Sequence, residues 1–167
     1  MRIETHSLEV YLNDHLAGAT FGAELARQLE ARVRHPDFQS EMSRLAEDIE
    51  ADLDTLRDLM QRLGASANPG KQVAAWVAEK ASRLKLSGVT SADDELGTFL
   101  GLEALSLGVE GKAALWTALR ELRGRYPELR SVDLDGLLDR AQRQRALLES
   151  ERIAIVTRSL TTSERQT

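Results

Sequence analysis

Residues 37–63 read DFQSEMSRLAEDIEADLDTLRDLMQRL. In this stretch the apolar side chains recur at alternating steps of four and three residues, which places them on one face of an α-helix. The face consists of Phe38, Met42, Leu45, Ile49, Leu56, Leu59 and Leu63. One polar residue, Asp52, occupies the step between Ile49 and Leu56. The stretch therefore predicts a long helix that packs into a helical bundle, carries one carboxylate on its packed face and ends at Gly64.

The segment before this helix has the same spacing. Residues 7–34 predict a helix whose packed face is Leu8, Leu12, His15, Ala19, Gly22, Ala26, Leu29 and Val33. The tripeptide His35-Pro36-Asp37 follows, and a proline disfavours helix in the residue before it but is favoured at a helix start. Because only a few residues join the two helices, we expect an antiparallel hairpin.

The second half of the chain predicts another hairpin after a longer connection. We expect a short amphipathic helix at about 71–84, a long helix from about 91–93 to 123, and a last helix from about 131–135 to 160. Gly124 and Pro127 separate the last two helices. Roughly 30 residues between the hairpins are enough to cross the length of a bundle, as in ferritin-like folds. The sequence thus predicts an all-α, ferritin-like four-helix bundle over residues 1–160 as one domain, followed by a flexible tail at 161–167.

Composition excludes several classes of function. The 167 residues include no Cys, which excludes disulfides, thiolate metal sites and cysteine nucleophiles. The formal net charge of −5 argues against a nucleic-acid surface, because phosphate binding needs a basic face. The start Met1-Arg2-Ile3-Glu4 leads into polar sequence without the apolar region of a secretion signal, and no apolar run reaches membrane-spanning length. We therefore expect a cytoplasmic protein that binds neither membranes nor nucleic acid.

Polar residues within the packed faces are the first candidates for function. His15 and Asp52 interrupt the faces of the first and second helices, and a hairpin turn near residue 35 brings them within about one helical turn, roughly 5 Å along the axis. The two side chains are thus candidates for contact inside the bundle. The alternatives are that His15 is an ordinary core or edge residue and that Asp52 reaches solvent.

The third helix carries two further candidates, Glu103 and Glu110, which lie seven residues apart on one face. The helix is otherwise almost entirely apolar, which is typical of a buried helix and would leave these carboxylates in need of partners. A hairpin turn near residue 130 places Glu110 opposite about Ser150, and therefore between Arg145 and Arg152 of the fourth helix. We therefore predict a core ladder of Glu–Arg ion pairs.

The histidine inventory argues against a dimetal centre. Such a centre in a four-helix bundle takes a Glu from each of two helices and a Glu-x-x-His from each of the other two. The three histidines are His6, His15 and His35, and all precede the second helix. Arg152 also places a fixed cation where a ligand would be needed. We therefore expect no catalytic residues, no metal ligands and no cofactor, with iron or manganese as the alternative.

Two stretches resemble known proteins. Residues 11–18, YLNDHLAG, are similar to the opening of the first helix of bacterioferritins and related ferritin-like proteins, and residues 105–112, LSLGVEGK, are similar to part of their third helix. The resemblance implies a ferritin-like bundle from a superfamily whose members store iron, oxidise it, activate oxygen or bind no metal. The family's metal-ligand positions fall on or near Ala19, Asp48, Ala51, Gly108, Glu149 and Arg152. The ligand set is therefore incomplete, and the resemblance is to a member without dimetal chemistry.

These observations lead to one preferred function and two alternatives. The preferred hypothesis is a non-enzymatic binding or stress-associated accessory protein of bacterial ferritin-like type, with a homodimer as a candidate assembly and an unknown ligand. Its core polar network would consist of His15, Asp52, Glu103, Glu110, Arg145 and Arg152. One alternative is a metal-binding oxidase or iron-handling protein with a carboxylate-rich site. The other is a small-molecule pocket beside Ala19 and Gly22, where small side chains leave room.

Overall fold

The protein is an all-α four-helix bundle. The computed structural model describes residues 6–32, 36–67 and 95–161, together with Ala75, Glu79 and Ser82. Its helices are α1 (His6–Arg32), α2 (Pro36–Arg62), α4 (Glu95–Glu121) and α5 (Leu134–Leu160), with a short 3-10 helix, η2 (Pro127–Ser131), before α5. The four long helices lie within a few residues of their predicted bounds, and the described residues contain no strand.

Two predicted features fall largely outside the described residues. The short helix at about 71–84 is represented only by Ala75, Glu79 and Ser82, each of which is helical. In the tail predicted at 161–167, only Thr161 is described, and its backbone N–H caps α5 by donating to the carbonyl oxygen of Thr157.

Local sequence explains where α2 ends and α5 begins. Gly64 has a φ of 71°, a left-handed conformation that glycine adopts without strain, and the backbone N–H of Ala65 donates to the carbonyl oxygen of Met60. The buried amide of Asn13 then donates to the carbonyl oxygen of Ser66 at 2.9 Å, which attaches this loop to α1. At the start of α5, the Asp133 side chain accepts from the N–H of Gly136 as an N-cap.

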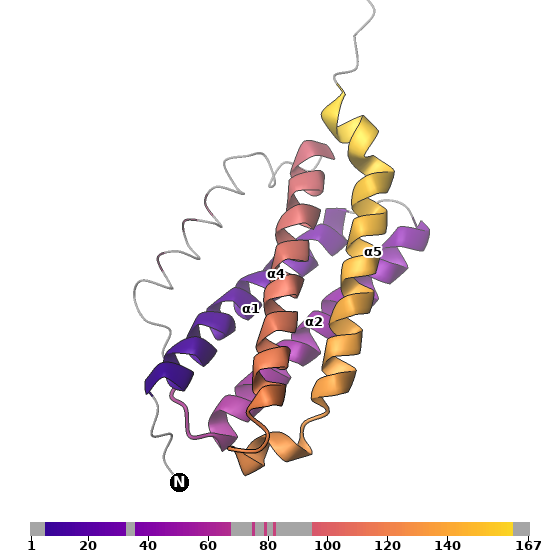
Figure 1. Ribbon diagram of the computed structural model, residues 1–167. Coiled ribbons are helices and arrows are strands. Elements are labelled where there is room, and N and C mark those ends of the chain that lie inside the picture. Colours follow the sequence, from indigo (N-terminus) through magenta and orange to yellow (C-terminus); the bar gives the residue numbers. More distant parts are fainter. Residues whose placement is uncertain are drawn as a thin grey trace, which may run out of the picture.

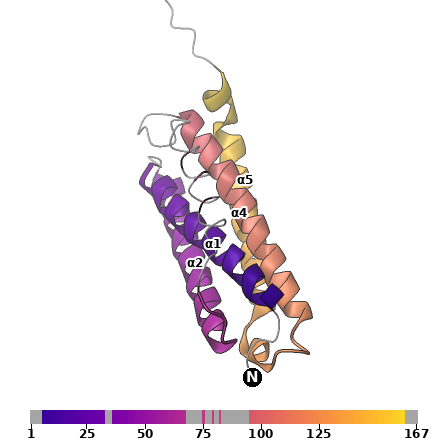
Figure 2. The same ribbon diagram turned by 90° about the vertical axis from the view of Figure 1, so that its left-hand side faces the viewer.

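The helices form two antiparallel hairpins, α1 with α2 and α4 with α5, which pack on each other as two layers with their axes crossing (Figures 1 and 2). α2 and α4 run in the same direction. α2 ends beside the turn between α4 and α5, where Arg62 Nη1 donates to Ser131 Oγ at 2.8 Å. α4 begins at the opposite end, where Ser159 Oγ donates to the carbonyl oxygen of Glu95 at 3.1 Å. The end of α2 and the start of α4 therefore lie at opposite ends of the bundle.

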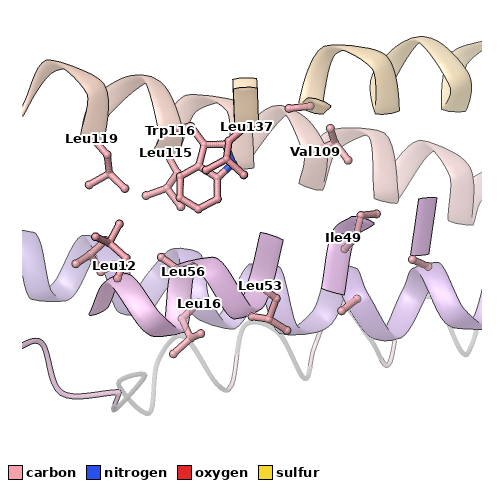
Figure 3. Close-up of a cluster of buried hydrophobic side chains, with 14 of the residues drawn as sticks. Leu12, Leu16, Ile49, Leu53, Leu56, Val109, Leu115, Trp116, Leu119 and Leu137 are labelled. Carbon is pink, nitrogen blue, oxygen red and sulfur yellow. The ribbon is translucent and has the colours of Figure 1, made fainter. Parts of the chain in front are cut away.

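The apolar core lies between the two hairpins, and Figure 3 shows part of it around Trp116. The predicted packed face of α2 is confirmed from Met42 to Leu63. Its apolar members in this range, Met42, Leu45, Ile49, Leu56, Leu59 and Leu63, are all buried. At the contact between α1 and α4, Gly101 lets the helices approach closely, since a Cβ there would lie 2.8 Å from Leu29 Cδ2.

The packed face of α1 differs from the prediction in the middle of the helix. Leu16 and Ala23 are buried, whereas His15 and Gly22 are only half-buried. The buried face is therefore displaced by one residue around the helix at this point. The reason is that α1 packs against both α2 and α4, so its buried stripe is wider than the single three-and-four pattern assumes.

Candidate functional site

A lysine lies at the centre of the polar interior. Lys112 Nζ, on α4, lies 2.6 Å from Asp52 Oδ2 on α2 and 2.6 Å from Gln144 Oε1 on α5. Asp52 is 1% exposed and Gln144 is 3% exposed. Three helices from both hairpins thus contribute one group each to a single buried hydrogen-bonded centre.

A second cation contacts the same carboxylate from the side of α5. Arg140 Nη1 lies 3.4 Å from Asp52 Oδ1 and 3.8 Å from Asp48 Oδ1. Asp52 Oδ1 is buried and accepts no hydrogen bond from the described residues, so its contact with Arg140 is electrostatic. We call Asp52, Lys112, Arg140 and Gln144 the Asp52 cluster. Its two cations are balanced by the carboxylates of Asp52 and Asp48.

Burial changes the acid–base properties of the central lysine. Loss of water around the ammonium lowers the pKa of Lys112 from its ordinary value of 10.5, and the nearby carboxylate of Asp52 opposes this shift. The ion pair is therefore what keeps a proton on an otherwise unfavourably buried amine. Losing the carboxylate would leave that charge without its main compensation.

Among the predicted polar residues, Asp52 lies in the interior but His15 does not reach it. The partners of Asp52 come from α4 and α5 instead of α1. The ring of His15 packs edge-on against Tyr11, with centroids 4.5 Å apart, and partial burial lowers the pKa of His15 against the influence of Asp14. The displaced packed face of α1 explains this difference, because it turns Leu16 inward in place of His15.

Two Glu–Arg pairs form between α4 and α5, but about five residues closer to the turn than expected, and they lie outside the core. Arg145 Nη1 is 2.6 Å from Glu110 Oε2, and both side chains are more than half exposed. Arg152 Nη1 is 3.3 Å from Glu103 Oε1, and Arg152 also pairs with Glu149 on its own helix. The expectation that these carboxylates are buried is therefore wrong.

The apolar composition of α4 accounts for that error. Leu107, nine residues before Trp116 on this helix, is 74% exposed. The helix therefore carries apolar residues on a face that the packing does not bury, so its composition overstates its burial.

Sequence reasoning missed three members of the Asp52 cluster, namely Lys112, Arg140 and Gln144. For two of them, Lys112 and Gln144, the sequence contains a pattern that could have identified them. Lys112 is the only basic residue between Leu96 and Leu119, in an otherwise apolar stretch. Gln144 stands between the buried residues Ala141 and Leu148, at steps of three and four, just as Asp52 stands between Ile49 and Leu56.

The structure also contains a groove between α2 and α5, with a volume of about 570 Å³. It is lined by Asp48, Thr55, Arg62, Ser131, Val132, Asp133, Gly136, Leu137, Arg140 and Arg143. A smaller hollow of about 140 Å³ lies farther along the same two helices, and Arg140 and Arg143 line both spaces. Both hollows lie away from Ala19 and Gly22 on α1, so the pocket considered there stays a prediction.

The donor atoms around Asp52 do not fit a dimetal centre. Within the described part of the chain, no group of three or more His, Asp or Glu residues is arranged to hold a metal ion. The buried carboxylate of Asp52 instead contacts the ammonium of Lys112 and the guanidinium of Arg140. Fixed cations at these positions repel a divalent ion from the carboxylate it would need.

Comparison with known proteins gives no relative. Neither family models, curated proteins nor solved structures include a match to this chain. In the ranges that the structure describes, no helix is long and apolar enough to cross a membrane. The Asp52 cluster and the groove are therefore the features that bear on function.

Proposed function

We propose that this protein is a non-enzymatic, ferritin-like bundle that acts as a binding or accessory protein, with a lysine ammonium in place of a dimetal centre. The observation that carries the proposal is the position of Lys112 Nζ, 2.6 Å from both the Asp52 carboxylate and the side-chain amide oxygen of Gln144. Oxygen atoms of these two kinds are also the ligands of hard metal ions. Here a side chain of the protein itself supplies the cation that they surround.

Electrostatics supports this assignment. A divalent ion about 4 Å from a unit positive charge is repelled by about 8 kcal/mol at an effective dielectric constant of about 20, twice the value for two unit charges. Lys112 and Arg140 both lie within 4 Å of the only carboxylate that is buried in the described core. A metal would have to displace both of these cations before it could use Asp52.

The helix arrangement supports the ferritin-like part of the proposal. Two antiparallel hairpins with α2 and α4 running in the same direction are the order that a bundle with one long crossover requires (Figure 1). The proposal also includes a cytoplasmic location and assembly as a homodimer. Light scattering on the purified full chain measures the oligomeric state directly.

Metal content is the decisive measurement. The full chain would be produced in medium supplemented with iron and manganese, purified without chelators and analysed for both elements, and oxygen uptake would be followed after addition of ferrous iron. We expect substoichiometric metal and no protein-dependent oxygen uptake. Two stoichiometric metals per chain would overturn the proposal, as would oxygen uptake that is lost in Asp52→Ala or Glu103→Ala.

The variant Lys112→Met provides the matched comparison, because it removes the ammonium while keeping a long side chain in the same place. If the cation excludes metal, this variant is the one in which Asp52 becomes open to a divalent ion, so its metal content should be equal to or above that of the wild type. A higher metal content in the wild type than in Lys112→Met would contradict the proposed role of Lys112.

A further inference from the structure

The groove between α2 and α5 has the size of a small-molecule site. Its volume of about 570 Å³ falls within the range of about 300–1,000 Å³ that is usual for ligand pockets. Val132 and Leu137, both buried, form apolar parts of its wall, while three arginines, Arg62, Arg140 and Arg143, line it from two sides. A groove of mixed lining with several guanidinium groups suits an organic molecule that carries an anionic group.

The three arginines differ in how far their hydrogen-bonding capacity is already used. Arg62 Nη1 donates to Ser131 Oγ, and Arg62 Nε lies 3.0 Å from Asp58 Oδ2. Arg140 approaches Asp48 and Asp52 only at 3.8 and 3.4 Å and donates no hydrogen bond to a described residue. Arg143 makes neither a hydrogen bond nor an ion pair within the described ranges. Two guanidinium groups of the groove thus have donors available for a ligand.

The charges in the groove favour an anion at these two arginines. Arg140 and Arg143 lie three residues apart on α5, so they are neighbours on one helix face, and of the two only Arg140 contacts carboxylates, those of Asp48 and Asp52. The acidic residues that line the groove are Asp48 and Asp133. Asp133 already caps α5, and Asp48 is balanced by its contact with Arg140. Arg143 is therefore the cation of the groove without a carboxylate partner.

We infer that the groove between α2 and α5 binds a small organic phosphate, whose phosphate group is held by the guanidinium groups of Arg140 and Arg143 and whose organic part lies against Val132 and Leu137. Guanidinium groups form paired hydrogen bonds with phosphate oxygens, and Arg143 supplies the positive charge that no carboxylate of the groove balances. This inference rests on the proposed function, because it supplies the class of ligand that the binding protein would take.

Calorimetric titration of the full chain tests the inference, with phenyl phosphate as the probe and ionic strength held constant with chloride. We expect saturable binding that is weaker for inorganic phosphate, which lacks the apolar part, and weaker for benzoate, which carries a single charge. Arg143→Gln should weaken the binding of phenyl phosphate about tenfold or more, since hydrogen bonds to charged groups are lost. Arg143→Lys should lie between Arg143→Gln and the wild type, because it keeps the charge without the paired donors.

Arg145→Gln is the matched control. It removes the same charge from the same helix two residues away, but Arg145 pairs with Glu110 and does not line the groove. The control should bind phenyl phosphate as the wild type does. Equal weakening in Arg143→Gln and Arg145→Gln would overturn the inference, because it would indicate general electrostatic attraction. Absence of saturable binding, or benzoate binding as tight as that of phenyl phosphate, would overturn it as well.

The two proposals fail in different ways. Arg143 has no partner among the described residues, so Arg143→Gln should leave the fold unchanged, which circular dichroism and the unfolding midpoint measure. Metal analysis of the same preparations tests the proposed function independently. Stoichiometric metal with intact phosphate binding would refute the metal-free bundle alone, whereas metal-free protein without phosphate binding would refute the inference alone.

Discussion

Replacing Asp52 with Asn should cost about 3–5 kcal/mol of unfolding free energy, the usual result of removing one partner of a buried ion pair. The substitution keeps the shape of the side chain but removes its charge. Lys112 would then remain buried with only the neutral Gln144 beside it, and Arg140 would keep only its longer contact with Asp48. Because whole domains are stable by about 5–15 kcal/mol, this single change would remove a large part of the total.

Urea unfolding followed by circular dichroism measures this loss, and thermal unfolding should show a midpoint lowered by about 6–20 °C for a chain of this length. A double-mutant cycle with Lys112→Met identifies its cause. Asp52→Asn with Lys112→Met leaves no unpaired buried ammonium, and the new amide lies close to that of Gln144, so the double variant should recover most of the loss.

Glu110→Gln is the control for this cycle. It also removes the acidic partner of an ion pair, but at a pair that is more than half exposed, and it should cost less than about 1 kcal/mol. A cost of Asp52→Asn no greater than that of Glu110→Gln would refute an uncompensated buried charge as the cause of the loss. Losses of Asp52→Asn and Lys112→Met that simply add in the double variant would refute that cause as well.

Three further predictions concern pH, a helix cap and two glycines. The pKa of Lys112 is lowered in the folded protein, so the unfolded chain binds more protons between that lowered pKa and 10.5. The unfolding free energy of the wild type relative to Lys112→Met should therefore rise as the pH increases through this interval, and a flat or falling difference in urea titrations would contradict it. Asp133→Ala should cost about 0.5–2 kcal/mol through loss of the α5 N-cap, and Asp133→Ser should restore most of it in the same assay. Gly101→Val should destabilise the protein by about 1–3 kcal/mol because its side chain meets Leu29. Gly108→Ala, which meets nothing within 4 Å, should stabilise it by about 0.5–1 kcal/mol, and thermal unfolding of both variants checks that the signs are opposite.

The helices could be predicted closely because their signals are local. The alternation of three- and four-residue steps in 37–63, the proline at 36 and the glycine at 64 each act within one or two turns, and α2 follows them. Asp52 was found in the same way, as a polar residue at a packed step. Its burial follows from the position that the helix gives it, whatever its partner is.

The partners of Asp52 could not be predicted, because they depend on how the two hairpins pack. Hairpin arithmetic relates α1 to α2 and α4 to α5. It brought Glu110 near both arginines of α5 but placed it opposite about residue 150, whereas its observed partner is Arg145. It does not relate α2 to α4, which are joined through a long connection. The contact between Asp52 and Lys112 lies between the two hairpins, so no spacing within either hairpin predicts it.

The Asp52 cluster also has a consequence for the uniqueness of the fold. An interior made largely of leucine and alanine offers many nearly equivalent ways for one hairpin to slide along the other, since each apolar contact is replaced by a similar one. A slide of one turn, about 5.4 Å, would carry Lys112 away from Asp52 and leave both charges buried without a counter-charge. We infer that the cluster selects one register between the hairpins. A variant with apolar residues at both positions should then give duplicated amide resonances by nuclear magnetic resonance, and a single set would show that side-chain shape alone fixes the packing.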